Sequence, residues 1–141
     1  MDDATVAMWI SRIRIGFGLT AVIAPRLAAR VLRGNAERGT LEPLFARMAG
    51  ARDIALGLGT VLAIDKGAPV RGWLEGSALS DTADCLSALA ARKQLTPRAS
   101  TGTAILSGTS AVLCGLLARR LDPPPDAHPH QPEAVVTGHH E

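Results

Sequence analysis

The chain has 141 residues, of which 47% are hydrophobic, 20% are charged and 3% are aromatic, and its formal net charge is +2. This length suits one domain, built either as a soluble core or as four membrane helices with short loops. The basic residues form no run interleaved with aromatic side chains, which argues against a nucleic-acid partner. The apolar content is mainly Ala, Leu, Val and Ile with 14 glycines, a composition that membrane helices tolerate because close backbone approach drives their packing.

Four apolar segments predict four helices, which run over residues 6–24, 43–64, 70–92 and 99–118. Pro25 ends the first helix because the residue before a proline resists the helical region. Residues 26–34 follow as a short amphipathic segment with arginines on its polar side, a pattern suited to a membrane surface. Turn residues at 65–69 separate the second and third helices.

We therefore expect an all-α fold, a four-helix transmembrane bundle with short loops. Residues 1–121 form the predicted membrane domain, and the Pro- and His-rich residues 122–141 form a predicted disordered tail. The segment 99–118 carries no charged residue and lies between Arg98 and Arg119. A helix of that length is about 30 Å long, which matches the hydrocarbon core of a bilayer.

Each predicted helix has one small or polar face and one bulkier aliphatic face. In the second helix the small face consists of Ala46, Gly50, Asp53, Gly57 and Thr60. Water would bury the aliphatic faces, whereas lipid would bury the polar ones. The polar face of the fourth helix carries Ser, Thr and Cys only, and a water-facing helix normally carries charge there. We therefore favour lipid, with a soluble helical interaction domain as the alternative.

Charged residues within these apolar helices form the candidate site. Three basic and three acidic residues balance in charge, namely Arg12, Arg14, Arg52, Asp53, Asp81 and Asp84. We assign five of them to a central polar network: Arg12, Arg52, Asp53, Asp81 and Asp84. An isolated charge at the bilayer centre costs about 2.5–3.5 kcal/mol on insertion scales, so such groups persist when they are paired or face inward. Two interpretations remain, a site for a ligand or proton relay and a set of salt bridges that fixes helix register.

Neither cysteine nor histidine patterns indicate a metal or a cofactor. Cys85 and Cys114 lie in separate apolar segments without a CxxC motif, so we interpret them as packed thiols. The four histidines of the predicted tail lack the spacing of a closed metal site. We expect no metal site and no cofactor.

Three stretches of the sequence resemble a known family. They read RIGFGLTAVIAPRLAARVL, GARDIALGLG and DTADCLSAL. Together they are similar to the small four-helix bacterial membrane proteins grouped around DoxX, nearest to a branch of unknown function common in high-GC actinobacteria. The resemblance covers about residues 10–118, and its motif positions are Gly16, Pro25, Gly50, Arg52, Asp53, Gly57 and either Asp81 or Asp84. It implies a four-helix membrane bundle and supplies no activity.

These observations leave three functional hypotheses. The first is a non-enzymatic, multi-pass protein of the cell membrane, a subunit or small-molecule binder whose partners are the lipid bilayer and either a second copy or another membrane protein. The second is an intramembrane enzyme that uses Asp53, Asp81 or Asp84 as general acid or base. The third is the soluble interaction domain. Whether the chain is an enzyme stays open, with the non-enzymatic hypothesis favoured.

The two predicted ends of the bundle differ in positive charge. The loops after the first and third helices carry Arg26, Arg30, Arg33, Arg38, Arg92, Lys93 and Arg98. The opposite end carries Lys66, Arg71, Arg119 and Arg120, with Arg12 and Arg14 added if they reach the interface. Because cytoplasmic loops are enriched in Lys and Arg, this distribution favours both termini outside.

Overall fold

The computed structural model describes residues 2–28 and 42–121 of the chain. Within these ranges the elements are α1 (Asp3–Ile23), α3 (Glu42–Asp65), α4 (Arg71–Ala90), the 3-10 helix η1 (Ala91–Lys93) and α5 (Pro97–Leu121). Residues 25–28 are also helical, and no strand occurs in the described ranges. The predicted all-α class is therefore confirmed. The expected tail, and all but the start of the amphipathic segment 26–34, lie outside the described residues.

Local signals explain where the helices begin and turn. Asp2 caps α1, because its carboxylate accepts a hydrogen bond from the Thr5 backbone N–H at 2.7 Å, and this bond lowers the pKa of Asp2. Helix α5 begins at Pro97, two residues earlier than expected, and the Thr96 hydroxyl accepts a bond from the Ala99 N–H at 3.3 Å. Gly67 makes the turn before α4 with a φ of +61°, a conformation that favours glycine.

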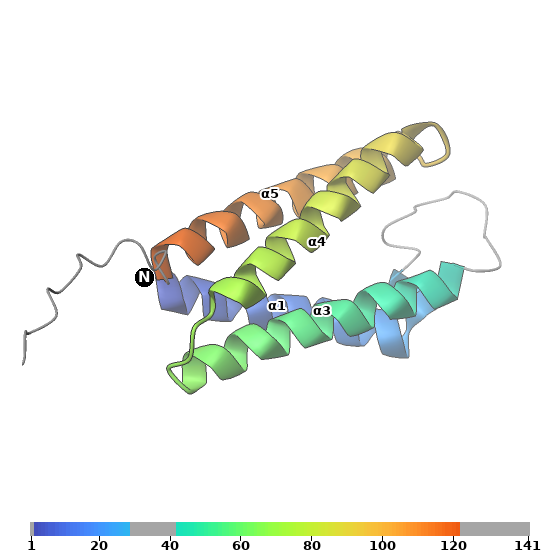
Figure 1. Cartoon of the computed structure of the whole chain (residues 1–141). Helices are drawn as coiled ribbons and strands as arrows, with labels where there is room; N and C mark the ends of the chain where they lie inside the picture. The colour runs from blue at the N-terminus through green and yellow to red at the C-terminus, as the bar shows by residue number, and fades with distance from the viewer. Residues whose placement is uncertain (1, 29–41, 122–141) are drawn as a thin grey trace, which may run out of the picture.

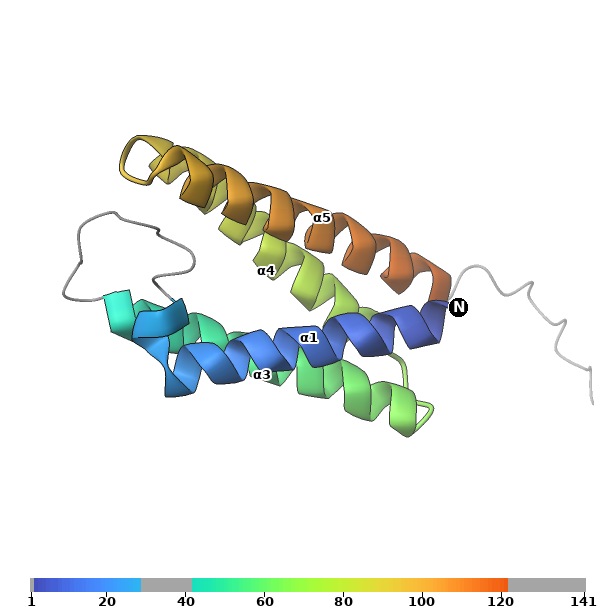
Figure 2. The same ribbon diagram turned by 180° about the vertical axis from the view of Figure 1, so that it is seen from behind.

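The helices form two pairs, and each pair packs along its length (Figure 1). Helix α1 lies against α3, and α4 lies against α5, whereas contacts between the two pairs are few. Figure 2 shows from behind that the pairs meet near the start of α1 and the end of α5 and diverge toward the other end. At the converging end, an Arg120 Nη1 lies 3.6 Å from an Asp3 carboxylate oxygen. The contact between the pairs is therefore limited.

Glycines set the close packing of α1 on α3. A Cβ atom added to Gly18 would lie 2.6 Å from the carbonyl oxygen of Gly50, and one added to Gly50 would lie 2.6 Å from that of Gly18. A Cβ atom at Gly57 would lie 2.8 Å from the carbonyl oxygen of Ser11. Helix α3 thus turns part of its predicted small-residue face toward α1, and only glycine fits at these contacts.

Many large hydrophobic side chains lie on the surface of this structure. Phe17, Ile23 and Leu79 are 59%, 78% and 73% exposed. Six polar or charged residues are buried together with the apolar core residues: Ser11, Arg14, Thr60, Ser77, Asp81 and Ser100. The buried apolar residues are mostly small, and Leu74 is the largest fully buried side chain. In water, large apolar side chains are the residues most often buried, and extensive apolar surface is rarely left open.

Two helices in the described ranges, α1 and α5, are long and apolar enough to cross a membrane. Helices α3 and α4 are of similar length, with 24 and 20 residues. Each of them carries charged residues near its middle, which lower its hydropathy. Whether α3 and α4 can also cross a membrane depends on whether these charges are paired within the fold.

Replacing Gly18 by Ala tests the close contact between α1 and α3. We expect Gly18→Ala to lower the free energy of unfolding by about 1–3 kcal/mol, because the added methyl group meets the α3 backbone. Gly16→Ala is the matched control on the same helix, since a Cβ there meets nothing within 4 Å. Alanine favours the helix, so the control should gain about 0.5–1 kcal/mol. Equal effects of the two variants, measured by thermal unfolding, would contradict the contact.

Candidate functional site

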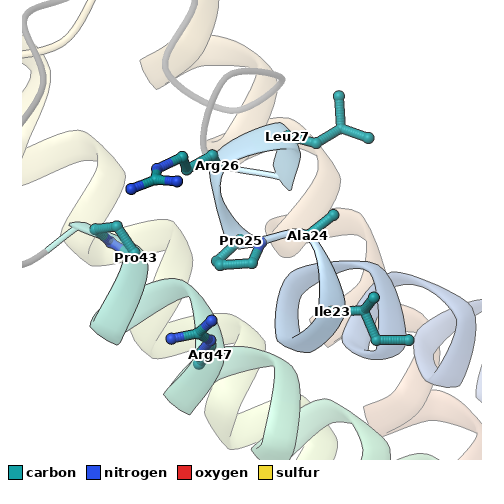
Figure 3. Close-up of a pocket in the computed structure, with 7 residues that line it drawn as sticks. All are labelled: Ile23, Ala24, Pro25, Arg26, Leu27, Pro43 and Arg47. Atoms are coloured by element: carbon teal, nitrogen blue, oxygen red, sulfur yellow. The ribbon is translucent and has the colours of Figure 1, made fainter.

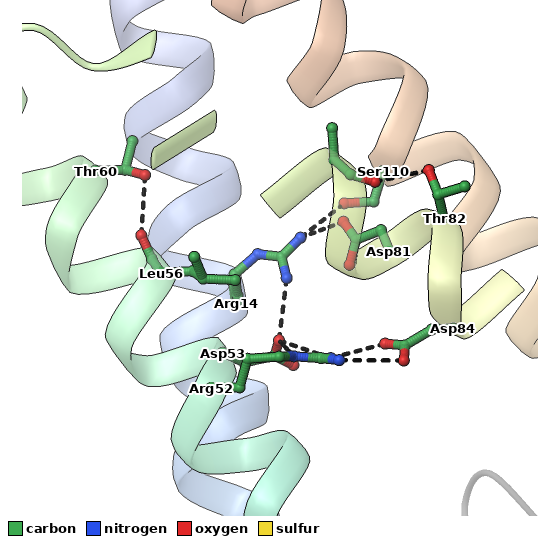
Figure 4. Close-up of polar contacts among 10 residues, drawn as sticks. Arg14, Arg52, Asp53, Leu56, Thr60, Asp81, Thr82, Asp84 and Ser110 are labelled. Carbon is green, nitrogen blue, oxygen red and sulfur yellow. Dashed lines mark hydrogen bonds and ion pairs between the residues drawn. The ribbon is translucent and has the colours of Figure 1, made fainter. Parts of the chain in front are cut away.

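Two arginines and three aspartates meet where the two helix pairs touch (Figure 4). They come from three helices: Arg14 from α1, Arg52 and Asp53 from α3, and Asp81 and Asp84 from α4. The hydroxyl of Ser110 brings in α5 as the fourth. We call these six residues the polar network. It draws at least one side chain from every long helix described.

The guanidinium of Arg14 lies at the centre of the polar network. Its Nη1 donates to Asp53 Oδ1 at 3.0 Å, and its Nη2 donates to Asp81 Oδ2 and, at 3.2 Å, to Ser110 Oγ. The side chains of Arg14 and Asp81 are each 8% exposed. One buried cation therefore connects α1 to α3, α4 and α5 at once.

Arg52 forms the more exposed half of the network. It binds Asp84 through two parallel bonds, Nη1 to Oδ1 at 3.2 Å and Nη2 to Oδ2 at 2.7 Å. Its Nη2 also lies 3.2 Å from Asp53 Oδ1, the oxygen that Arg14 uses. The side chains of Arg52 and Asp84 are 34% and 39% exposed. Two-bond arginine–carboxylate pairs of this kind fix geometry as well as contribute energy.

The glycine packing of α1 on α3 sets the register that brings Arg14 to Asp53. The two helices run antiparallel, with Gly18 opposite Gly50. Arg14 precedes Gly18 by four residues and Asp53 follows Gly50 by three, so both side chains fall at the same level of the pair. One turn further, Ser11 faces Gly57. The small residues therefore position the charged ones.

The polar network carries unequal numbers of opposite charges. When all five ionisable groups are charged, its carboxylates outnumber its guanidiniums by one. Removing a charge from water costs several kcal/mol, which is offset only where a partner lies at hydrogen-bonding distance. Asp53 accepts hydrogen bonds from both arginines at one oxygen, so this shared carboxylate links the buried half of the network to the exposed half.

The structure brings together four of the five residues that the sequence assigns to the network. These are Arg52, Asp53, Asp81 and Asp84. Arg12 does not join them: it is exposed, and its guanidinium carbon lies 5.7 Å from the ring centroid of Trp9. Arg14 takes the expected place instead. The two arginines lie about 200° apart around α1, so only one can face the other helices.

The spacing of small residues in α1 carried the signal for Arg14. Ala7, Ser11, Arg14 and Gly18 follow one another at helical spacing and are all buried. A face composed of small residues in a helix that packs closely is the contact face. Choosing the arginine that shares this face selects Arg14. The face drawn through Arg12 contains Gly16, which is exposed and has open space around it.

The surroundings of the network offer little other chemistry. Cys85 and Cys114 are both free thiols, and Cys114 is only 1% exposed. The described residues contain no group of three or more His, Cys, Asp or Glu side chains placed to hold a metal ion. The hydroxyl of Ser80 is buried without a hydrogen-bond partner. The groups that can act chemically here are thus the aspartates themselves.

Comparison of the chain with protein-family models, curated proteins and solved structures finds no match. The resemblance to the DoxX group therefore gains no support from these comparisons. Any function assigned to the polar network has to come from its geometry.

Replacing Arg14 tests whether the centre of the network holds the fold. We expect Arg14→Gln to lower the free energy of unfolding by about 3–5 kcal/mol, because it leaves Asp81 and Asp53 buried without their main partner. Arg12→Gln is the matched control, an arginine on the same helix that faces outward. It should change stability by less than about 1 kcal/mol. A similar loss in both variants, measured by thermal unfolding, would remove Arg14 from its central role.

Neutralising single aspartates tests the excess of carboxylates. Asp84→Asn keeps an acceptor oxygen and makes the numbers of positive and negative charges equal. Because Asp84 lies at the exposed edge of the network, we expect the free energy of unfolding to fall by less than about 1 kcal/mol. Asp81→Asn also equalises them but removes the partner of the buried Arg14, and its expected cost is about 3–5 kcal/mol. Thermal unfolding of both variants under one set of conditions shows which of them loses more stability. The reverse order would show that Arg52 and Asp84, rather than Arg14 and Asp81, hold the helix pairs together.

Proposed function

We propose that this chain is a non-enzymatic, multi-pass protein of the cell membrane, in which four helices span the bilayer as a bundle around the polar network. The proposal rests on two features that occur together: charged side chains are buried, and large hydrophobic side chains face outward. Arg14 and Asp81 are buried while Phe17, Ile23 and Leu79 are exposed. This is the arrangement that lipid stabilises and water does not.

Helix length supports four spans. The helices α1, α3, α4 and α5 contain 21, 24, 20 and 25 residues. At 1.5 Å per residue they are about 30–38 Å long, enough to cross a hydrocarbon core of about 30 Å with some tilt. Arg52, Asp53, Asp81 and Asp84 lower the hydropathy of the two central helices, yet each has an opposite charge within hydrogen-bonding distance. Paired, inward-facing charges are the kind that membrane helices retain.

The contacts within the network support a structural role. Each arginine donates to two carboxylates, and the central one also donates to a serine hydroxyl. The bonds cross from the α1–α3 pair to the α4–α5 pair, which otherwise touch little. We therefore assign the network to holding the two pairs in one relative position. A membrane subunit or small-molecule binder needs such a fixed scaffold, with its outward faces available for a second copy or another membrane protein.

The excess carboxylate favours a second candidate, an intramembrane acid–base role. An aspartate that exchanges a proton has to be free of a permanent ion pair during its cycle. Asp84 is the most exposed of the three network aspartates, and unlike Asp53 it binds one arginine only. It is therefore the residue that this alternative assigns as acid or base.

Membrane fractionation with an alkaline carbonate wash tests the spanning proposal. We expect the expressed full chain to remain in the pellet after the wash and to need detergent for extraction, because its aliphatic faces contact lipid. A peripheral protein held by its basic residues would be released. Release into the carbonate supernatant, or solubility without detergent, would overturn the membrane assignment and favour the soluble interaction domain.

Asparagine variants then separate the structural role from acid–base chemistry. In a scaffold, Asp53→Asn should reduce the amount of folded, membrane-retained protein, and Asp84→Asn should reduce it less. The matched control is Glu75→Gln, which removes an exposed carboxylate that pairs with Arg71 on the surface of α4. Full retention of Asp53→Asn at wild-type stability would contradict the scaffold role. Loss of a cellular phenotype in Asp84→Asn at full retention would favour the acid–base alternative.

A further inference from the structure

A hollow lies at the end of the α1–α3 pair, away from the polar network (Figure 3). It forms where α1 ends at Ile23, Pro25 redirects the chain, and α3 begins beside it. Its volume is about 470 Å³, within the range of about 300–1,000 Å³ that small-molecule sites occupy. Seven residues of the described ranges line it: Ile23, Ala24, Pro25, Arg26, Leu27, Pro43 and Arg47.

The polar side chains known to line this hollow are cationic. Arg26, just after α1, and Arg47, in the second turn of α3, both line it, and none of the described side chains that line it is acidic. Figure 3 shows the two side chains on the α3 side of the hollow, with Pro43 between them. Arg47 donates from Nε to the carbonyl oxygen of Val22 at 3.4 Å, and its two terminal nitrogens have no hydrogen bond to another described residue. Two guanidiniums that line one hollow favour an anionic ligand.

The other part of the hollow is apolar and faces outward. Ile23 and Leu27 are 78% and 51% exposed, and Figure 3 shows them on the opposite side from the two arginines. Pro25 forms the wall between the two parts and is buried. A ligand that matches both parts has a negatively charged head and an apolar body.

We propose that this hollow binds the phosphate of an anionic phospholipid headgroup, with Arg26 and Arg47 donating to the phosphate oxygens. Guanidiniums match phosphate through parallel hydrogen bonds. Ile23 and Leu27 then contact the glycerol and upper acyl region. This proposal rests on the membrane-spanning function proposed above, because it places the ends of α1 and α3 at the bilayer surface.

The charge of the surrounding surface agrees with this assignment. The same end of the structure carries three further exposed basic residues, Arg92, Lys93 and Arg98, on η1 and the start of α5. The opposite end mixes signs: Asp2, Asp3 and Asp65 lie there with Lys66, Arg119 and Arg120. Basic residues near the membrane attract anionic lipids and mark the cytoplasmic side. The hollow thus faces the leaflet in which anionic headgroups are enriched.

Native mass spectrometry of the full chain in uncharged detergent tests the lipid site. Phosphatidylglycerol is titrated against phosphatidylcholine, which carries the same phosphate without net charge. We expect one phosphatidylglycerol to bind in preference, and Arg26→Gln and Arg47→Gln each to weaken it about fivefold. Arg92→Gln is the matched control, a basic residue at the same end outside the hollow, and should change affinity less than twofold. Arg47→Lys keeps the positive charge and should lose less affinity for phosphatidylglycerol than Arg47→Gln.

Four outcomes would overturn the site. The first is equal binding of the two lipids, and the second is a loss of lipid affinity in Arg92→Gln as large as in the hollow variants. The third is unchanged binding in the double variant Arg26→Gln with Arg47→Gln. The fourth is displacement of the lipid by an equimolar amount of inorganic phosphate, which would assign the hollow to a free anion. Thermal unfolding of each variant shows that the fold persists. Carbonate extraction of the same preparations keeps the two proposals apart: release from the membrane removes the spanning function, whereas retention without lipid preference removes the headgroup site alone.

Discussion

The guanidinium of Arg14 is the group on which the rest of this structure depends. It is buried at the point where the two helix pairs meet, and it contacts Asp53 of its own pair and Asp81 and Ser110 of the other. Few other contacts join the pairs, so the ion pairs contribute much of what fixes their relative position. A charge in such a place is stable only when its partners are also fixed, which ties the network to the helix packing.

Close packing and charge pairing support each other in this fold. Gly18 and Gly50 let α1 approach α3, and this approach sets the register at which Arg14 reaches Asp53. The proposed membrane placement would explain why both are needed: there is no hydrophobic driving force between helices in a bilayer, so small-residue contacts and polar bonds provide the association. In that placement the outward-facing Leu, Ile and Phe side chains meet lipid tails. In water the same surface would favour aggregation.

The middle of the molecule and one of its ends have different proposed roles. The network near the middle connects the pairs, while the basic hollow at the end of α1 and α3 has the chemistry to bind a lipid headgroup. Arg26 and Arg47 line that hollow with no acidic neighbour among its described lining residues, unlike Arg14 and Arg52, whose hydrogen bonds go to carboxylates. Arginine thus occurs here in two settings, as a buried cation paired with carboxylates and as a cation at an exposed hollow, which we propose lies at the bilayer surface.

The sequence by itself determined the helical class, the approximate helix bounds and the choice of four of the network residues, because these follow from periodicity, proline positions and the cost of charge in an apolar segment. It placed the start of α5 two residues late, since Thr96 and Pro97 act through capping rather than hydropathy. The tertiary structure corrected the choice of Arg12 to Arg14, because both lie in one apolar helix and the face that meets α3 is the one that Arg14 shares with Ala7, Ser11 and Gly18. It alone also showed the pairing of helices and the hollow beside Arg47, which depend on how segments distant in the chain pack together.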